Sequence, residues 1–432
     1  MIIRNAEIRG KIRDVLLSGD RIQAIGKDIG GDEVFDANGG ALIPGLHDHH
    51  IHLNALAAAM NSVRCGPPEV TSKPQLIKAL NQEREGWLRG VGYHQSVAED
   101  IDRAWLDKYG PARPIRIQHR SGRLWILNSR AMAELGINKP ENGRLLDSDL
   151  KIRTRSAFPD LGPLVQRLLS YGITGVTEVT PSNGWAEYEN YIRAAAPLRL
   201  SIMGHSDLSP SQSQHLKLHY HDHDLPALDA LADEMKQAHI SGRNIAAHCV
   251  TRAELMLTLA ALEIAGPVYG DRIEHAAIAD DAAIEWMSKL EVIIVTQPNF
   301  IVERERAYIK DVPQYEHKNL WRLKAFADAG LKLAAGSDAP FGDPNPWTAM
   351  AAATVRPSGF ESESVSPETA LELYTKPSGD AGGVARRIEI GATADMCLLD
   401  RPWAKAQKNL TDVRVKAAWI DGEIVYQSSF IT

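Results

Sequence analysis

Short apolar segments alternate with amphipathic helical segments between residues 45 and 383, and this alternation limits the possible folds more than any other feature. A strand followed by a helix, repeated many times, is typical of a parallel α/β fold, and a stretch of this length favours a (β/α)8 barrel of the TIM type. The predicted strands lie in the segments 113–120, 172–180, 198–205, 215–220, 243–250, 272–278, 291–298 and 331–340.

The two ends of the chain have a different pattern. Residues 1–44 and 384–432 form short apolar and polar runs broken by turn residues, such as Asn38-Gly39-Gly40 near the start and Asp421-Gly422 near the end. Asp-Gly between alternating segments is a strong β-hairpin signal. We therefore expect all-β ends around the α/β middle.

Composition points to a soluble globular protein. The 432 residues are 44% hydrophobic and carry a formal net charge of −7, without the basic run that nucleic-acid binding requires. We find neither a signal peptide nor an apolar window long enough to span a membrane, so we expect a cytoplasmic protein without a membrane or nucleic-acid partner. The oligomeric state stays open, and a homodimer is one option. Cys65, Cys249 and Cys397 are widely spaced, which favours buried thiols over disulfides.

The stretch "PGLHDHHIHL", residues 44–53, contains four histidines. Side chains alternate between the faces of a strand, so Asp48, His50 and His52 would share one face. Two imidazoles at i and i+2 can reach one cation, but they complete only half of a coordination shell. Alone, the stretch could equally be a polar rim.

Three later strands also end in residues that can bind metals, namely His248, His275 and Asp338. Because active sites in (β/α)8 barrels lie at the carboxyl ends of the strands, these side chains should converge with His50 and His52. The sequence therefore predicts a metal centre.

The chain resembles the amidohydrolase superfamily of metal-dependent hydrolases. "PGLHDHHIHL" looks like its first-strand signature, and "IEIGATADMCLLD" looks like its usual return strand. The segments "RPIRIQHRSGRLWILNS", "VTQPNF" and "AAGSDAPFGDPNPW" resemble the branch that contains the N-substituted formamide deformylases. The resemblance implies a barrel over residues 45–383 and one small β-sandwich domain built from residues 1–44 and 384–432.

The resemblance also implies a set of metal ligands. His50, His52 and Asp338 would hold one divalent ion, and His248 and His275 a second, with zinc expected and manganese, iron or nickel as alternatives. Lys217 would bridge the two ions as N6-carboxylysine, and Glu178 is the competing bridge. An ordinary surface or salt-bridged lysine is the alternative for Lys217. His219, His221 and His223 follow it as rim residues.

Two metal ions sharing a water would generate hydroxide at neutral pH and favour hydrolysis. The resemblance implies that the bond is a C–N bond in a small-molecule amide or cyclic amide other than a peptide bond. The expected catalytic residues are Asp338, which would move the proton to the leaving nitrogen, and His275. The expected substrate-binding residues are Tyr93, His94, Gln118, Arg123, Trp125 and Glu178.

Arg123 replaces the histidine that is usual in the deformylase branch. A guanidinium there would suit a carboxylate-bearing substrate such as an N-acyl amino acid or a dipeptide, with formamides as another class; a surface ion pair is the alternative.

Two other functions stay open. A nucleobase-type deaminase of this superfamily would carry a glutamate three residues after His248, where this chain has Thr251. A non-catalytic barrel scaffold would be expected to lack metal ligands, yet none of the expected ligands is missing.

Overall fold

The computed structural model describes residues 1–31, 33–67, 69–82, 86–146 and 158–429. The chain forms two compact units: Met1–Leu53 together with Leu161–Thr432, and Asn54–Asp160.

The larger unit contains eight parallel strands in two sheets. One sheet has the order β13-β12-β6, and the other has the order β14-β15-β16-β17-β18. Seven of the predicted segments and the histidine-rich stretch supply these strands, which confirms the predicted α/β class. The bounds are β6 (Leu46–Ile51), β12 (Ile173–Glu178), β13 (Arg199–Ile202), β14 (His215–Leu218), β15 (Asn244–Cys249), β16 (Arg272–His275), β17 (Ile293–Thr296) and β18 (Lys332–Ala335).

Backbone hydrogen bonds join these two sheets at both of their edges. Just after β13, the carbonyl of Gly204 accepts a bond of 3.0 Å from the amide of Lys217 in β14. Just after β18, the amide of Asp338 donates a bond of 2.7 Å to the carbonyl of His50 in β6. Gly204, just after β13, therefore lies against β14 of the other sheet, and Asp338, just after β18, lies against β6.

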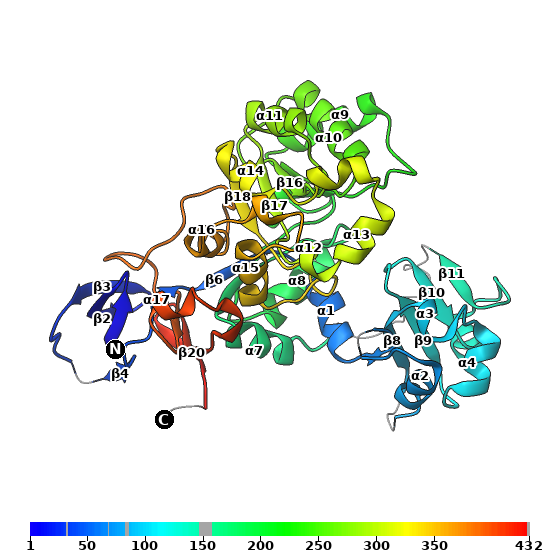
Figure 1. Cartoon of the computed structure of the whole chain (residues 1–432), viewed down its shortest axis with the longest axis horizontal. Helices are drawn as coiled ribbons and strands as arrows, with labels where there is room; N and C mark the ends of the chain where they lie inside the picture. Colours follow the sequence, from blue (N-terminus) through cyan, green and yellow to red (C-terminus); the bar gives the residue numbers. More distant parts are fainter. Residues whose placement is uncertain (32, 68, 83–85, 147–157, 430–432) are drawn as a thin grey trace. The chain divides into compact units, whose positions relative to one another are not determined.

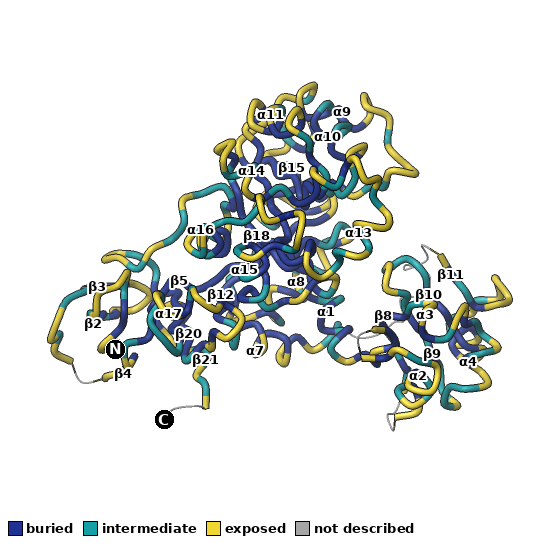
Figure 2. Tube along the Cα trace, viewed as in Figure 1, coloured by how far each residue is buried: buried dark blue, intermediate teal, exposed yellow. Residues whose placement is uncertain are grey.

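Helices follow most of these strands, and Figure 2 shows buried strands beside helices with exposed residues. Gly266 is the C-cap of α10 (Arg252–Ala265), and Ser366 caps the N-terminus of α16 (Pro367–Glu372). The helices of this unit include α7 (Gly162–Ser170), α8 (Trp185–Ala194), α9 (Leu228–Ile240), α10 (Arg252–Ala265), α11 (Asp281–Lys289), α12 (Phe300–Glu303), α13 (Glu305–Asp311), α14 (Leu323–Asp328), α15 (Pro346–Thr354), α16 (Pro367–Glu372) and α17 (Trp403–Ala406).

The two ends of the chain form two four-stranded sheets, β3-β2-β1-β4 and β21-β20-β19-β5, which lie beside each other in Figure 1. Their inner faces share one hydrophobic core, in which the rings of Phe35 and Trp419 form a T-shaped contact at a centroid distance of 5.1 Å. The bounds are β1 (Ile2–Ile8), β2 (Lys11–Ser18), β3 (Arg21–Gly26), β4 (Val34–Asp36), β5 (Leu42–Pro44), β19 (Met396–Leu399), β20 (Val415–Ile420) and β21 (Glu423–Gln427).

The predicted hairpin at the C-terminal end is confirmed. Asp421 and Gly422 connect β20 to β21 with φ values of +54° and +79°. Two consecutive left-handed residues fit the sharp turn that an Asp-Gly pair makes most readily.

Replacement of Trp419 by alanine tests whether the two ends share one core. The indole is fully buried against residues from both sheets, so its loss should lower the free energy of unfolding by about 3–5 kcal/mol. Urea denaturation measures the change. Trp185→Ala is the control, because the Trp185 side chain is exposed. A small change for both variants would contradict the shared core.

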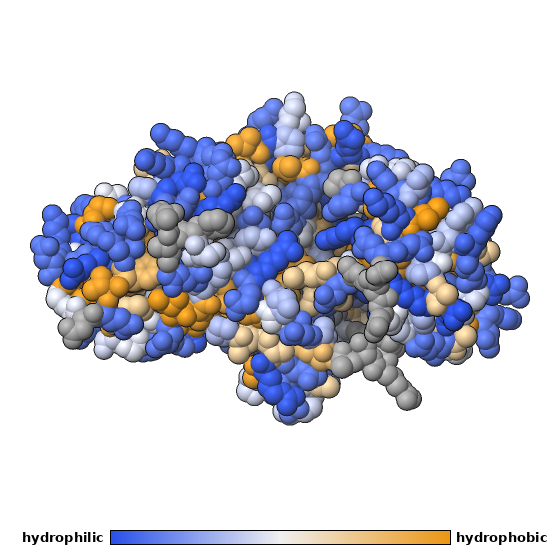
Figure 3. All heavy atoms as spheres, turned by 90° about the horizontal axis from the view of Figure 1, so that it is seen from below, coloured by the Kyte–Doolittle hydropathy of each residue, from blue (hydrophilic) through white to orange (hydrophobic). Residues whose placement is uncertain are grey.

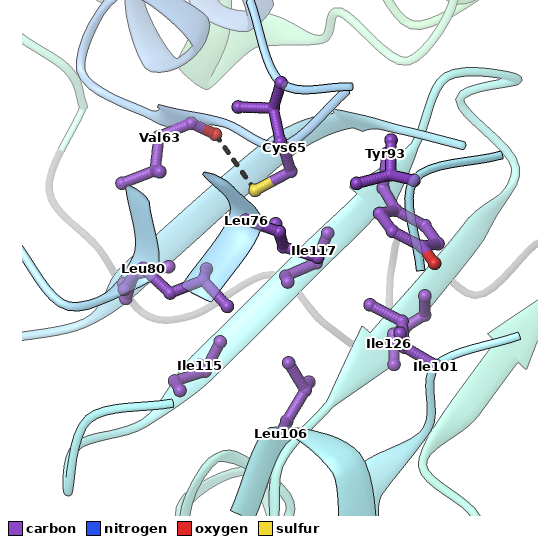
Figure 4. Close-up of a cluster of buried hydrophobic side chains, with 13 residues drawn as sticks. Val63, Cys65, Leu76, Leu80, Tyr93, Ile101, Leu106, Ile115, Ile117 and Ile126 are labelled. Atoms are coloured by element: carbon purple, nitrogen blue, oxygen red, sulfur yellow. Dashed lines mark hydrogen bonds between the residues drawn. The ribbon is translucent and has the colours of Figure 1, made fainter. Parts of the chain in front are cut away.

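The smaller unit has its own sheet, β11-β10-β9-β8-β7, and its own hydrophobic core. Figure 4 shows this core, in which the side chains of Cys65, Leu76 and Ile117 lie together and the Tyr93 ring extends toward Ile101 and Ile126. The sequence interpretation did not separate this unit, and the predicted strand 113–120 belongs to its sheet. The bounds are β7 (Val63–Arg64), β8 (Leu88–Tyr93), β9 (Ile115–His119), β10 (Leu124–Leu127), β11 (Arg144–Leu146), α2 (Lys73–Leu80), α3 (Gln95–Ala98), α4 (Arg103–Tyr109) and α5 (Ser129–Leu135).

The face drawn in Figure 3 is mainly hydrophilic, with scattered hydrophobic patches. None of the described helices is both long and apolar enough to cross a lipid bilayer.

Candidate metal centre

Three predicted ligands meet where β6 and β18 end. The Nε2 atoms of His50 and His52 lie 3.3 Å and 3.2 Å from Oδ1 of Asp338. Within the described part of the chain, these three residues form the one group of three or more potential ligands whose donor atoms all lie within 4.8 Å of one another. One carboxylate and two imidazoles with donor atoms this close together suit a divalent transition metal.

Two further predicted ligands extend this group. The ring of His275 lies 4.8 Å from that of His50, and the ring of His248 lies 4.5 Å from that of His275, measured between centroids. Burial, together with the neighbouring imidazoles, holds the pKa of His248 well below its usual value, and burial lowers the pKa of His275 to about 3. Both rings are therefore neutral at pH 7, which is the form that binds metals.

Left-handed backbone helps to bring these side chains together. His275 has a φ of +72°, the following Ala276 a φ of +49°, and Asp338 a φ of +53°. Non-glycine residues rarely adopt such values, and where they do the surroundings must hold them in place. Strain at two of the predicted ligands is consistent with a functional site.

Three of the histidines have one ring nitrogen already engaged. Nδ1 of His50 lies 2.5 Å from Glu274 Oε2, Nδ1 of His52 lies 2.9 Å from Thr180 Oγ1, and Nδ1 of His275 lies 2.7 Å from Gln297 Oε1. The oxygens of Glu274 and Gln297 can only accept, so they select the tautomers of His50 and His275 whose Nε2 lone pair is free. The donor set therefore fits a metal ion bound through Nε2 atoms.

Lys217 is buried at 7% exposure, and its Nζ has no hydrogen-bond partner among the residues that the structure describes. Burial lowers the pKa of its amine, although the charges of Glu274 and Asp338 oppose the shift. An unpaired buried ammonium is costly, so the neutral amine becomes easier to form. The neutral amine is also the form that reacts with carbon dioxide to give a carbamate.

Glu178, the competing bridge, is buried at the end of β12 and has its oxygens engaged. Oε2 accepts a hydrogen bond of 2.5 Å from the amide of Leu53, and Oε1 accepts bonds from the amide of Thr180 at 2.9 Å and from Asn183 at 3.3 Å. These bonds connect the end of β12 to the residues just after β6. The Glu178 carboxylate therefore stabilises the local backbone.

Glu274 was not predicted as a site residue, yet it contacts His50 directly. It is fully buried, and its Oε1 lies 2.9 Å from Nη2 of Arg272. Burial opposes ionisation, but the charges of Arg272 and Lys217 hold the pKa of Glu274 well below its usual value. The segment "RIEH" offered one signal, since it places an arginine and a glutamate on one face of a strand that is otherwise apolar.

Replacement of Glu274 by glutamine should weaken metal binding about 10–100-fold, as is typical when a residue that orients a histidine ligand is changed. The amide keeps the size of the side chain but loses the charge that holds His50. Competition with a chromogenic chelator measures the affinity. Glu316→Gln is the matched control, because Glu316 is a buried carboxylate that pairs with Arg252 at 3.2 Å outside the centre. Equal affinity in both variants would contradict the orienting role.

The remaining predicted substrate-binding residues lie in the smaller unit. Tyr93 and Trp125 are buried in two hydrophobic clusters there. The guanidinium of Arg89 lies 5.6 Å from the Trp125 ring, and the other residues have local partners. His94 caps α3 by accepting from the amide of Ser96, Gln118 accepts from Arg89 at 3.3 Å, and the amide of Arg123 donates to the Ser121 hydroxyl at 3.4 Å.

Comparison with known proteins decides the family. Residues 33–426 match the family described as the amidohydrolase family. The chain belongs to this family. The resemblance predicted from the sequence is thus confirmed. This amidohydrolase is 24% identical to an N-substituted formamide deformylase of Arthrobacter pascens, over 96% of this chain and 94% of that protein. It is also 24% identical to the amidohydrolase YtcJ of Bacillus subtilis (strain 168), over 92% of this chain and 91% of that protein.

A solved structure shares the fold of this amidohydrolase. The structure of an uncharacterized metal-dependent hydrolase from Pyrococcus furiosus aligns with a TM-score of 0.72 at 22% identity, and the alignment covers 93% of this chain and 98% of that chain.

Proposed function

We propose that this amidohydrolase is a divalent-metal-dependent hydrolase that cleaves a C–N bond in a small amide or cyclic amide. The observation that carries the proposal is the convergence of His50, His52 and Asp338 from the ends of two strands, with His248 and His275 in ring contact beside them. Family membership supports the reaction class, and the deformylase relative makes formamides the first substrates to test.

We propose that the eight parallel strands form a (β/α)8 barrel over residues 45–383, with the unit Asn54–Asp160 inserted after β6. The strand order and the hydrogen bonds at both edges of the two sheets support this proposal. The shared core of the terminal sheets supports one β-sandwich domain from residues 1–44 and 384–432.

The proposed ligands of two divalent ions, with zinc as the expected metal, are His50, His52, Lys217, His248, His275 and Asp338. When bound, such ions would lower the pKa of a shared water and polarise the substrate carbonyl. We propose that Lys217 takes part as N6-carboxylysine. Its buried amine, which has no hydrogen-bond partner in the described part of the chain, supports this assignment over Glu178, whose oxygens already accept hydrogen bonds.

Asp338 is the proposed proton carrier. Burial alone would raise the pKa of its carboxyl, but the adjacent imidazoles of His50 and His52, together with His275, hold that pKa well below its usual value. Both imidazoles approach Oδ1, which leaves Oδ2 to take the proton of the attacking water and deliver it to the leaving nitrogen. Glu274 and Gln297 hold the rings of His50 and His275 in place for this step.

The deaminase alternative is less well supported. Thr251, at the position where a deaminase would need its glutamate, caps α10 by accepting from the amide of Glu254 at 3.2 Å. The carboxylate of Glu254 accepts in return from the amides of Val250 and Thr251. This capping box occupies both side chains with helix stabilisation.

Screening the zinc-loaded protein against formamides, N-acyl amino acids, dipeptides, lactones and nucleobases tests the proposal. We expect turnover of at least one of the first three classes. A preference for substrates with a free carboxylate would support Arg123 as a binding residue. Turnover of lactones or nucleobases alone would contradict the proposed substrate class.

A further inference from the structure

A chain of imidazoles connects the proposed metal centre to a loop that follows β14. Its first two members, His221 and His223, lie in that loop, and its last member, His50, belongs to the centre. Successive ring centroids are 5.4, 4.7, 4.6, 4.5 and 4.8 Å apart along the order His223, His221, His219, His248, His275 and His50.

The loop that carries the outer histidines is held in place. The hydroxyl of Tyr220 hydrogen-bonds to that of Thr258 in α10, which anchors the loop at its start. The amide of Asp224 donates to the carbonyl of His221 at 2.9 Å and closes a turn around His223. In this turn the rings of His221 and His223 stack with an interplanar angle of 13°. The turn therefore holds the two imidazoles side by side, where both can contact the same cation.

The chemistry of the loop suits transient binding of a transition-metal cation. Asp222 and Asp224 add negative charge beside the imidazoles, and Oδ1 of Asp222 lies 3.8 Å from Nδ1 of His223. Local charge of this sign raises the concentration of cations near a surface, and imidazole favours zinc-like ions over magnesium or calcium. A tight group of three ligands is found, among the described residues, at the buried centre and not in this loop. The loop would thus bind a cation weakly enough to release it.

We propose that residues 219–224 form a metal-capture site, which takes a divalent transition-metal ion from solution and passes it inward to the centre. The inference rests on the proposed metal centre. Two nitrogens that share one zinc ion each lie about 2.0–2.1 Å from it, so neighbouring rings at the observed spacing can exchange the ion with small side-chain movements. His219 links the loop to His248, the first proposed permanent ligand along this path.

Metal uptake by the full-length apoprotein tests the proposal. Zinc is mixed with the apoprotein, and a fluorescent zinc indicator follows the free ion at limiting concentration. The variant His221→Gln/His223→Gln should take up zinc about tenfold more slowly than the parent, because it loses the local cation capture. Its final zinc content should equal that of the parent. His205→Gln is the control, since the exposed His205 pairs with Asp207 at 3.7 Å and belongs to no part of the ring chain.

The outcomes separate the two proposals. Slower uptake in the loop variant alone, with an unchanged final content, supports the capture site. Uptake at the parent rate with normal final content would overturn the capture site and leave the metal centre standing. A parent protein that binds no zinc would overturn both.

Discussion

Replacement of Asp338 by asparagine is expected to reduce turnover about 10²–10⁴-fold, the range that a positioned acid–base group supplies. Asparagine keeps the shape of the side chain, and its amide cannot carry a proton from water to a leaving nitrogen. It also loses the negative charge that lies 3.3 Å and 3.2 Å from the His50 and His52 imidazoles. The rate constant kcat at saturating metal measures the effect.

Asp395→Asn is the matched control for this variant. Asp395 is also a buried carboxylate, and it pairs with Arg199 at 2.9 Å outside the centre. We expect it to keep the parent kcat. An Asp338→Asn enzyme that keeps more than about a tenth of the parent activity would contradict the acid–base role.

Replacement of Lys217 by alanine is expected to lower the metal content from two ions towards one and nearly to eliminate turnover. Two cations about 3.5–4 Å apart need an anionic bridge to offset their repulsion, and a carbamate on Lys217 would supply it. Elemental analysis measures the metal content. Short carboxylic acids such as propionate should restore part of the activity, because they can occupy the space that the carbamate leaves.

Lys332→Ala is the control for this second variant, since Lys332 lies in β18 with its amine over the Tyr269 ring. Two tightly held ions in Lys217→Ala would contradict the bridging role. Glu178→Gln would then be the next variant to test.

The positions of most centre residues could be predicted from the sequence. Parallel strands end at a common edge, so a polar residue that closes an apolar segment is expected to meet its equivalents on other strands. His50 and Asp338 follow this rule, with His50 Nε2 at 3.3 Å from Asp338 Oδ1. Lys217 is buried in its apolar strand without a hydrogen-bond partner among the described residues, and its place among the metal ligands stays a prediction.

Glu274 shows why the rest could not be predicted. Alternation in a strand places Glu274 and His275 on opposite faces, so only one of them should reach the centre. Both contact His50, Glu274 through a hydrogen bond of 2.5 Å and His275 through its ring. The left-handed φ of +72° at His275 breaks the alternation. No sequence pattern predicts a left-handed backbone at a non-glycine residue such as this one.

The separate unit Asn54–Asp160 could not be predicted from the sequence either. Its strands β8 and β9 have the same pattern of apolar residues as the strands of the larger unit, and this pattern does not show which sheet a strand joins. Tyr93 and Trp125 illustrate the consequence. As aromatic residues near predicted strand ends they are expected to bind substrate; they lie in hydrophobic clusters of this unit, and their contact with substrate stays a prediction.

The most direct test of the metal centre is anomalous diffraction from crystals of the zinc-loaded protein, recorded on both sides of the zinc absorption edge. The proposed centre predicts two zinc peaks about 3.5–4 Å apart. One peak should be bound by His50, His52 and Asp338 and the other by His248 and His275, with density for a carbamate on Lys217 between them. Zinc bound elsewhere, with these side chains free of metal, would contradict it.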